Sequence, residues 1–155
     1  MSDMMELLKK LCPLRLAPVS KDTDVCVEFL RNELPFVVHE YSSDSEHNGW
    51  VVPKKWEVKR AQIKKAGQLI YDGYKHPMGV IGYSQSFKGR VNLKDLNPHL
   101  FHHPDWPNAI VYHCDLYYKV GQQNWGFSVP YNLYEALEPG NYDVDLETTH
   151  ESGTM

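Results

Sequence analysis

The chain has 155 residues, of which 42% are hydrophobic and 23% are charged, a composition typical of one folded domain rather than of a disordered segment. Its net charge of −4 argues against nucleic-acid binding, which requires a basic patch. Because the first ten residues are charged, the three cysteines lie far apart and no apolar run could span a bilayer, we expect a cytoplasmic protein with reduced thiols, no signal peptide and no membrane contact.

Two short helices are predicted at the start of the chain. Residues 3–11 carry apolar side chains at helical spacing and end before a proline, which cannot continue a helix. Residues 22–34 place Val25, Cys26 and Phe29 on one stripe, and the acidic residues at their start suit the helix dipole. Both helices precede strand-like sequence, so we expect them to form a cap or part of another structure.

After these helices the pattern changes to short apolar or alternating runs separated by turn residues, which predicts β-strands. The predicted strands comprise residues 36–41, 50–53, 56–63, 68–73, 78–87, 109–120, 125–130 and 142–149. Residues 64–67 are expected to form a hairpin turn, and residues 88–90 a second turn. Residues 92–100 are typical of a short helix capped by Asn92, and residues 132–137 of a helical turn.

These elements predict a mainly β fold with α+β character, namely a jelly-roll or β-sandwich-like domain preceded by two short helices. We expect an N-terminal helical segment over residues 1–41, the β-sandwich-like domain over residues 42–149 and a tail over residues 150–155.

The longest predicted strand, residues 109–120, contains the strongest hint of metal chemistry. Successive side chains of a strand point to opposite faces, so Cys114 would face the core while His113, Asp115 and Tyr117 share the other face. His113 and Asp115 can hold a metal ion if other segments supply further ligands. The alternative interpretation is a polar strand face with an ordinary His–Asp hydrogen bond.

The sequence HHPDWP, residues 102–107, predicts a loop whose two prolines fix the backbone. The candidate residues for binding a ligand or partner are His102, His103, Asp105, Trp106, Tyr117 and Trp125. Four tryptophans also suggest a sugar-binding platform, although aromatic residues of small β domains more often lie in the core. The sequence contains no nucleophile elbow, phosphate-binding loop or HExxH motif, and we predict no catalytic residue.

Four segments carry a resemblance to a known family: WVVPKKWEV (50–58), NPHLFHHPDWPNAIVY (97–112), YYKVGQQNWGF (117–127) and EPGNYDVD (138–145). They resemble the N-terminal part of bacterial aminopeptidase-like zinc peptidases, in which a β domain of unknown function is inserted into a peptidase domain. The first two helices resemble the opening of that peptidase domain, and the residues from about 42 resemble the insert. Leu116 and Ser128 stand where the family tends to have Ser and Cys. No position of this chain matches the family's zinc ligands or catalytic carboxylates.

The resemblance implies a non-catalytic accessory domain that docks on or gates a peptidase-like partner subunit, or that self-associates. Zinc is then expected only through the partner or through a weak site at His113 and Asp115, and no other cofactor is predicted. Two alternatives stay open: a stand-alone metal-dependent enzyme that uses His113 and Asp115, and a carbohydrate-binding module. The expected ligand is a peptide or a carbohydrate, and whether the chain itself is an enzyme is left open.

Overall fold

The computed structural model describes residues 4–113 and 124–155. Internal contacts divide the chain into two units. Met1–Glu57 and His150–Met155 form the first, called here the helical unit, and Val58–Thr149 form the second, the sheet unit. No helix in the described part of the chain is long and apolar enough to cross a membrane.

The helical unit begins with α1 (Met4–Leu11) and α2 (Lys21–Glu33), which confirms the two predicted helices. The start of α2 is capped by Ser20, whose Oγ accepts a hydrogen bond from the backbone N–H of Thr23 (3.1 Å). Such a cap satisfies one of the N–H groups that a helix leaves without an internal partner. Neither helix has a buried side chain, although both carry the apolar stripe that normally faces a core.

A small hairpin completes the helical unit. Its strands are β1 (Glu46–His47) and β2 (Trp50–Val51). Between them Asn48 and Gly49 have φ values of 53° and 81°, which Asn-Gly pairs adopt readily in hairpin turns. The end of the chain is paired as well, because the backbone N–H groups of Tyr41 and Met155 each donate to the other residue's carbonyl oxygen (2.9 and 2.8 Å).

The predicted strand over residues 36–41 is wrong. This segment is irregular, and Val37 is 78% exposed. Its β-branched residues favour an extended backbone, but a strand also needs a neighbouring strand to complete its hydrogen bonds. Among the residues of this segment, Tyr41 has the backbone pairing described above.

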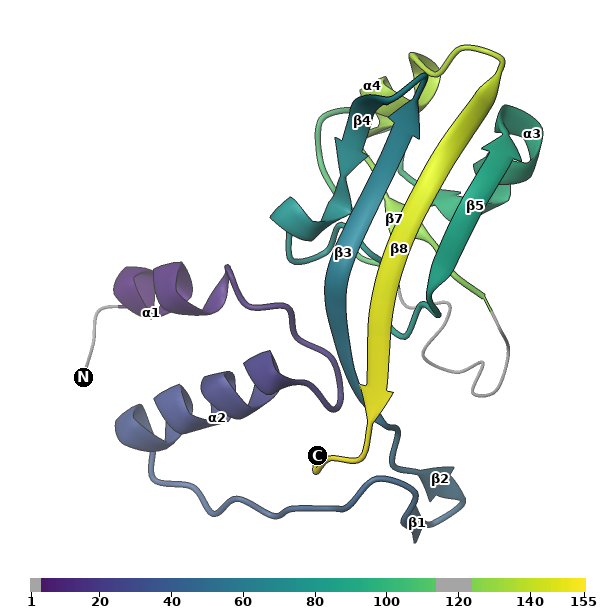
Figure 1. The fold of residues 1–155 in the computed structure, drawn as a ribbon. Helices are drawn as coiled ribbons and strands as arrows, with labels where there is room; N and C mark the ends of the chain where they lie inside the picture. The colour runs from purple at the N-terminus through teal and green to yellow at the C-terminus, as the bar shows by residue number, and fades with distance from the viewer. Residues whose placement is uncertain (1–3, 114–123) are drawn as a thin grey trace. The chain divides into compact units, whose positions relative to one another are not determined.

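The sheet unit is built on a four-stranded antiparallel sheet in the order β4-β3-β8-β5 (Figure 1). The strands are β3 (Lys55–Lys65), β4 (Gln68–Asp72), β5 (Phe87–Asn92) and β8 (Asn141–Glu151). The predicted hairpin between β3 and β4 is confirmed, and its two turn residues, Ala66 and Gly67, have φ values of 49° and 81°. The predicted last strand is confirmed as β8.

The two faces of the sheet differ. On β8 the side chains of Tyr142, Val144 and Leu146 are buried. The alternate residues of β8 are acidic and form ion pairs with neighbouring strands: Asp143 with Arg90 (2.7 Å), and Asp145 and Glu147 with Arg60 (3.0 and 2.8 Å). One face therefore contributes to the core, and the other presents paired charges to solvent.

Short elements cover the buried side of the sheet unit. They are η1 (Gly73–Lys75), α3 (Leu93–Leu96), η2 (Asn97–His99), β6 (Leu100–Phe101), β7 (Phe127–Ser128) and α4 (Tyr131–Glu135). β6 and β7 form a parallel pair. The predicted helix after β5 is confirmed, because Asn92 Oδ1 accepts from the backbone N–H of Asp95 (3.0 Å) and caps α3. The predicted helical turn over residues 132–137 corresponds to α4.

Two predictions in the sheet unit are wrong, and a third is wrong over its described residues. Residues 78–86 form turns and one isolated bridge, between Val80 and Phe127, rather than a strand, because Tyr83 at φ 63° interrupts an extended backbone. Residues 88–90 lie inside β5 and do not form a turn. Of the predicted strand over residues 109–120, residues 109–113 are irregular and the rest lie outside the described residues. The fold is nonetheless β-rich with antiparallel sheets and some helix, as predicted, while a jelly roll or sandwich stays a prediction.

Candidate functional site

The loop of residues 102–108 holds four of the predicted binding residues in a defined conformation. The backbone N–H of Trp106 donates to the carbonyl oxygen of His103 (3.2 Å), and the N–H of Ala109 donates to that of Trp106 (3.0 Å). These are two successive turns, and prolines at positions 104 and 107 restrict the backbone further. As a result the indole of Trp106, which is 57% exposed, is presented to solvent by a restrained backbone.

The loop is anchored to α4. The backbone N–H of Asn132 donates to the carbonyl oxygen of Pro107 (3.0 Å). The side-chain amide of Asn132 donates to Oδ1 of Asn108 (2.7 Å). Because the same residue bonds two consecutive loop positions, α4 fixes the register of the loop. This long-range contact is not visible in the sequence.

His102 points into an aromatic cluster on α4. Its ring centroid lies 3.9 Å from that of Tyr134 and 5.2 Å from that of Tyr131. Its Nδ1 is buried and has no hydrogen-bond partner among the described residues. Desolvation lowers the pKa of His102 below its usual value, opposed in part by the nearby Glu135, and the neutral ring is therefore favoured. These contacts support a packing role for His102 within this loop.

His103, Asp105 and Trp106 form the exposed part of the loop. The backbone N–H of Asp105 donates to Nδ1 of His103 (3.3 Å), and the His103 ring centroid lies 4.8 Å from that of Trp106. The Asp105 carboxylate lies 3.9 Å from the same Nδ1. An exposed indole beside an imidazole and a carboxylate offers both a stacking surface and hydrogen-bonding groups to a ligand. Three of the predicted binding residues are thus brought together at one surface.

The other predicted binding residues are placed differently. Trp125 is only 7% exposed and lies between the rings of His99 (3.7 Å, 6°) and Phe87 (4.4 Å, 17°). This stack belongs to the core, so Trp125 offers little surface to a ligand. Tyr117 lies outside the described residues. Binding roles for both residues stay predictions.

The predicted metal pair is described only in part. The ring of His113 lies 5.2 Å from that of Phe101, whereas Asp115 and the neighbouring Cys114 lie outside the described residues. Within residues 4–113 and 124–155 no group of three or more histidine, cysteine, aspartate or glutamate side chains is arranged to hold a metal ion. A metal at His113 and Asp115 stays a prediction.

The helical unit contains a second candidate surface, which the sequence reasoning did not identify as a site. Met4, Met5, Leu8, Leu34 and Val37 are between 43% and 78% exposed. We call these five residues the apolar helical set. The sequence placed Met4 and Leu8 at helical apolar spacing and Val37 in a predicted strand, and the two helices were expected to form a cap or part of another structure. Met4 and Leu8 lie one turn apart on α1 and are neighbours on its surface, and adjoining exposed apolar side chains are typical of a surface that another protein covers.

Comparison with known proteins gives three similarities. A family model described as "Domain of unknown function (DUF2172)" matches residues 55–149. A protein of Clostridium acetobutylicum named "Putative polysaccharide biosynthesis protein with aminopeptidase-like domain" is 27% identical over 154 residues, which cover 99% of this chain and 35% of that protein. The crystal structure of a "putative peptidase" from the same organism superposes with a TM-score of 0.82 at 25% identity, over 97% of this chain and 35% of that one. This chain therefore spans little more than a third of the length of each relative, and the predicted resemblance to peptidase-like proteins is confirmed at that level.

Proposed function

Since this chain belongs to the family described as a domain of unknown function (DUF2172), we propose that it acts as a non-catalytic binding domain that docks on a peptidase-like protein. The apolar helical set is the observation that carries this proposal. Isolated helices of eight and thirteen residues are marginal in water, and neither α1 nor α2 buries a side chain within the described structure. Covering these residues would supply the missing stabilisation.

The length of the relatives indicates what could cover the set. Both helices lie within the region that aligns with the clostridial relative, yet most of that relative lies outside the aligned region. Its name includes an aminopeptidase-like domain. A domain of that kind, on the same chain or a separate one, is therefore the occupant we assign to the apolar helical set.

Binding to the aminopeptidase-like part of the clostridial relative tests this proposal. We expect the full chain to form a one-to-one complex that elutes as a single species in size-exclusion chromatography with light scattering. Leu8→Gln and Val37→Gln should each weaken the complex about tenfold, since replacing a buried apolar contact with a polar side chain commonly costs ~1–2 kcal/mol. Leu69→Gln is a matched control, because Leu69 is also 43% exposed but lies on β4 in the sheet unit.

Two results would oppose docking. The first is the absence of a complex at concentrations near 100 μM, about the weak end of specific recognition. The second is equal binding by the wild-type chain and by Leu8→Gln. A concentration-dependent dimer of the chain alone, abolished by Leu8→Gln, would instead assign a second copy as the occupant.

Carbohydrate binding is a second candidate function, and the exposed Trp106 is the observation that favours it. An indole beside His103 and Asp105 can stack on a sugar ring while the polar groups bond its hydroxyls. The relative's name, which includes polysaccharide biosynthesis, points the same way. Soluble oligosaccharides should then shift the tryptophan fluorescence of the wild-type chain and of Trp50→Phe, but leave Trp106→Ala unbound. Equal binding by Trp106→Ala would remove this candidate.

A further inference from the structure

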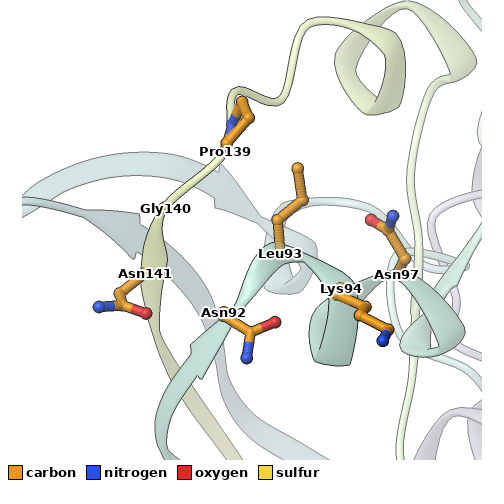
Figure 2. A pocket seen from close by; sticks show the side chains of 7 residues that line it. All are labelled: Asn92, Leu93, Lys94, Asn97, Pro139, Gly140 and Asn141. Atoms are coloured by element: carbon orange, nitrogen blue, oxygen red, sulfur yellow. The ribbon is translucent and has the colours of Figure 1, made fainter.

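A pocket of about 460 Å³ opens where β5 passes into α3, beside the turn that leads into β8 (Figure 2). Two of its lining residues are bonded to each other, because the backbone N–H of Leu93 donates to the carbonyl oxygen of Gly140 (3.0 Å). Asn92 and Asn141 stand opposite each other in the β5–β8 register at its edge. The volume falls within the range of ~300–1,000 Å³ that small-ligand sites occupy. All of its lining residues belong to the sheet unit.

Three polar side chains that line the pocket have groups without a partner among the described residues: Lys94 and Asn141, which are exposed, and Asn97, which is half-buried. Lys94 forms no ion pair, and the Asn141 amide forms no hydrogen bond, with any residue in the described part of the chain. Oδ1 of Asn97 is buried and likewise has no partner among those residues. A buried polar atom without a partner is costly, and such atoms often mark a place that water or a ligand completes.

Unlike these three side chains, Asn92 in the same pocket has both ends of its amide bonded within the chain. Its Oδ1 accepts from the backbone N–H of Asp95 (3.0 Å) and its Nδ2 donates to the Asp95 carboxylate (2.6 Å). Asn92 is therefore committed to capping α3. The groups that remain for a ligand are two amides and one ammonium.

We propose that this pocket binds the C-terminal end of a peptide, with Lys94 pairing the terminal carboxylate. Each asparagine amide offers one donor side and one acceptor side, which match the C=O and N–H of a peptide bond. Among the described residues no carboxylate lines the pocket, and the Asp95 carboxylate next to it is bonded to Asn92. An ammonium strengthens a hydrogen bond to a carboxylate.

The apolar part of the lining suits a peptide better than a saccharide. Leu93 points toward Pro139, and the Asn97 amide lies on the other side of Leu93 in the same view (Figure 2). These two apolar side chains can contact an aliphatic side chain at the end of a peptide. No aromatic side chain from residues 4–113 or 124–155 lines the pocket, whereas a sugar ring is best received by an aromatic face. This site and the docking surface in the helical unit are independent of each other.

Titration of the full ¹⁵N-labelled chain with N-acetyl-dialanine tests the proposal. We expect the backbone amides of Leu93, Lys94 and Gly140 to shift with a Kd of about 1 mM, typical of weak recognition. The same dipeptide with a C-terminal amide should bind up to about fivefold more weakly, because an exposed ion pair is worth up to about that factor. Lys94→Gln should reduce the affinity for the acid by a similar factor.

Lys75→Gln is the matched control variant. Lys75 is exposed, belongs to η1 and does not line the pocket, so the substitution changes the net charge equally and should leave binding unchanged. Three results would overturn the proposal: no shifts at about 20 mM ligand, equal binding of the acid and its amide, or equal binding by Lys94→Gln. Acetate binding as tightly as the dipeptide would reduce the pocket to an anion site, and tighter binding of glucuronic acid would assign it to saccharides. Both of these results would also overturn the peptide assignment.

Discussion

At the scale of single residues, His102 combines burial, aromatic contacts and a titratable group. Its ring packs against Tyr131 and Tyr134, and its Nδ1 lacks a partner among the described residues. Desolvation lowers the pKa of His102, with Glu135 acting in the opposite direction and His103 in the same one. The folded state therefore binds a proton at this site less readily than the unfolded chain does.

This asymmetry predicts a loss of stability in mild acid. The contribution of His102 is fully present above the unfolded pKa of about 6.5 and is lost as the pH falls below that value toward the lower folded pKa. His102→Phe keeps a ring but cannot titrate, so its melting temperature should fall less than that of the wild type between pH 7 and pH 5. His39→Phe is the control, because His39 is exposed and lies outside the cluster. Differential scanning fluorimetry measures the melting temperatures. An equal fall in melting temperature for the wild type and His102→Phe between pH 7 and pH 5 would contradict the prediction.

At the scale of elements, the turn from η1 to Gly79 depends on a close backbone contact between Gly73 and Gly79, which only residues without a Cβ allow. A Cβ added at Gly73 would lie 2.6 Å from the Gly79 carbonyl oxygen and 3.0 Å from Cδ1 of Phe127. The Gly79 peptide is held on both sides, because its N–H donates to His76 (2.9 Å) and its carbonyl oxygen accepts from Ser128 (3.3 Å). A side chain at Gly73 therefore displaces a fixed backbone.

Gly73→Ala should lower the free energy of unfolding by about 1–3 kcal/mol, the usual cost of forcing extra atoms into a packed site. Urea denaturation monitored by tryptophan fluorescence measures this change. Lys75→Ala, in the same short element but exposed, should change the free energy by less than about 0.5 kcal/mol. A Gly73→Ala variant as stable as the wild type would show that the turn can move.

Elements with complete local signals were predictable from the sequence. The apolar spacing gave α1 and α2, the turn residues 64–67 gave the β3–β4 hairpin, and Asn92 gave the cap of α3. The strand predictions for residues 36–41 and 78–87 were wrong because an apolar segment forms a strand only where another strand pairs with it. The pairing strand comes from a distant part of the sequence.

In the candidate site, too, the locally determined features were predictable from the sequence and the long-range contacts were not. The two prolines predicted a conformationally restricted loop at residues 102–107, and Trp106 is exposed on this loop. The anchor from Asn132 to Pro107 and Asn108 was not predictable, because it joins residues far apart in the chain. Trp125 was predicted as a binding residue, but it packs between His99 and Phe87 in the core. This packing joins distant residues and was not predictable from the sequence.

At the scale of the whole molecule, the two N-terminal helices and the four-stranded sheet differ in whether they bury side chains. The family model matches residues 55–149, which nearly coincide with the sheet unit of Val58–Thr149. The helical unit is shared with the longer clostridial relative, which aligns with 99% of this chain. The unit that nearly coincides with the family model includes the buried residues of β8, whereas α1 and α2 have no buried side chain and the buried apolar residues of the helical unit lie outside them, at Ala17, Val19, Val52 and Trp56.

This difference predicts unequal protection from hydrogen exchange in the isolated chain. Amides of α1 should exchange with little protection, because a helix without buried side chains opens locally at low cost. Amides of Val144 and Leu146, buried on β8, should exchange only through global unfolding and be protected by about 10³-fold or more. Mass spectrometry of the deuterated full chain resolves the two regions. Protection of α1 equal to that of β8 in the isolated chain would contradict the prediction, whereas protection that arises only when the peptidase-like protein is added is what docking through the apolar helical set requires.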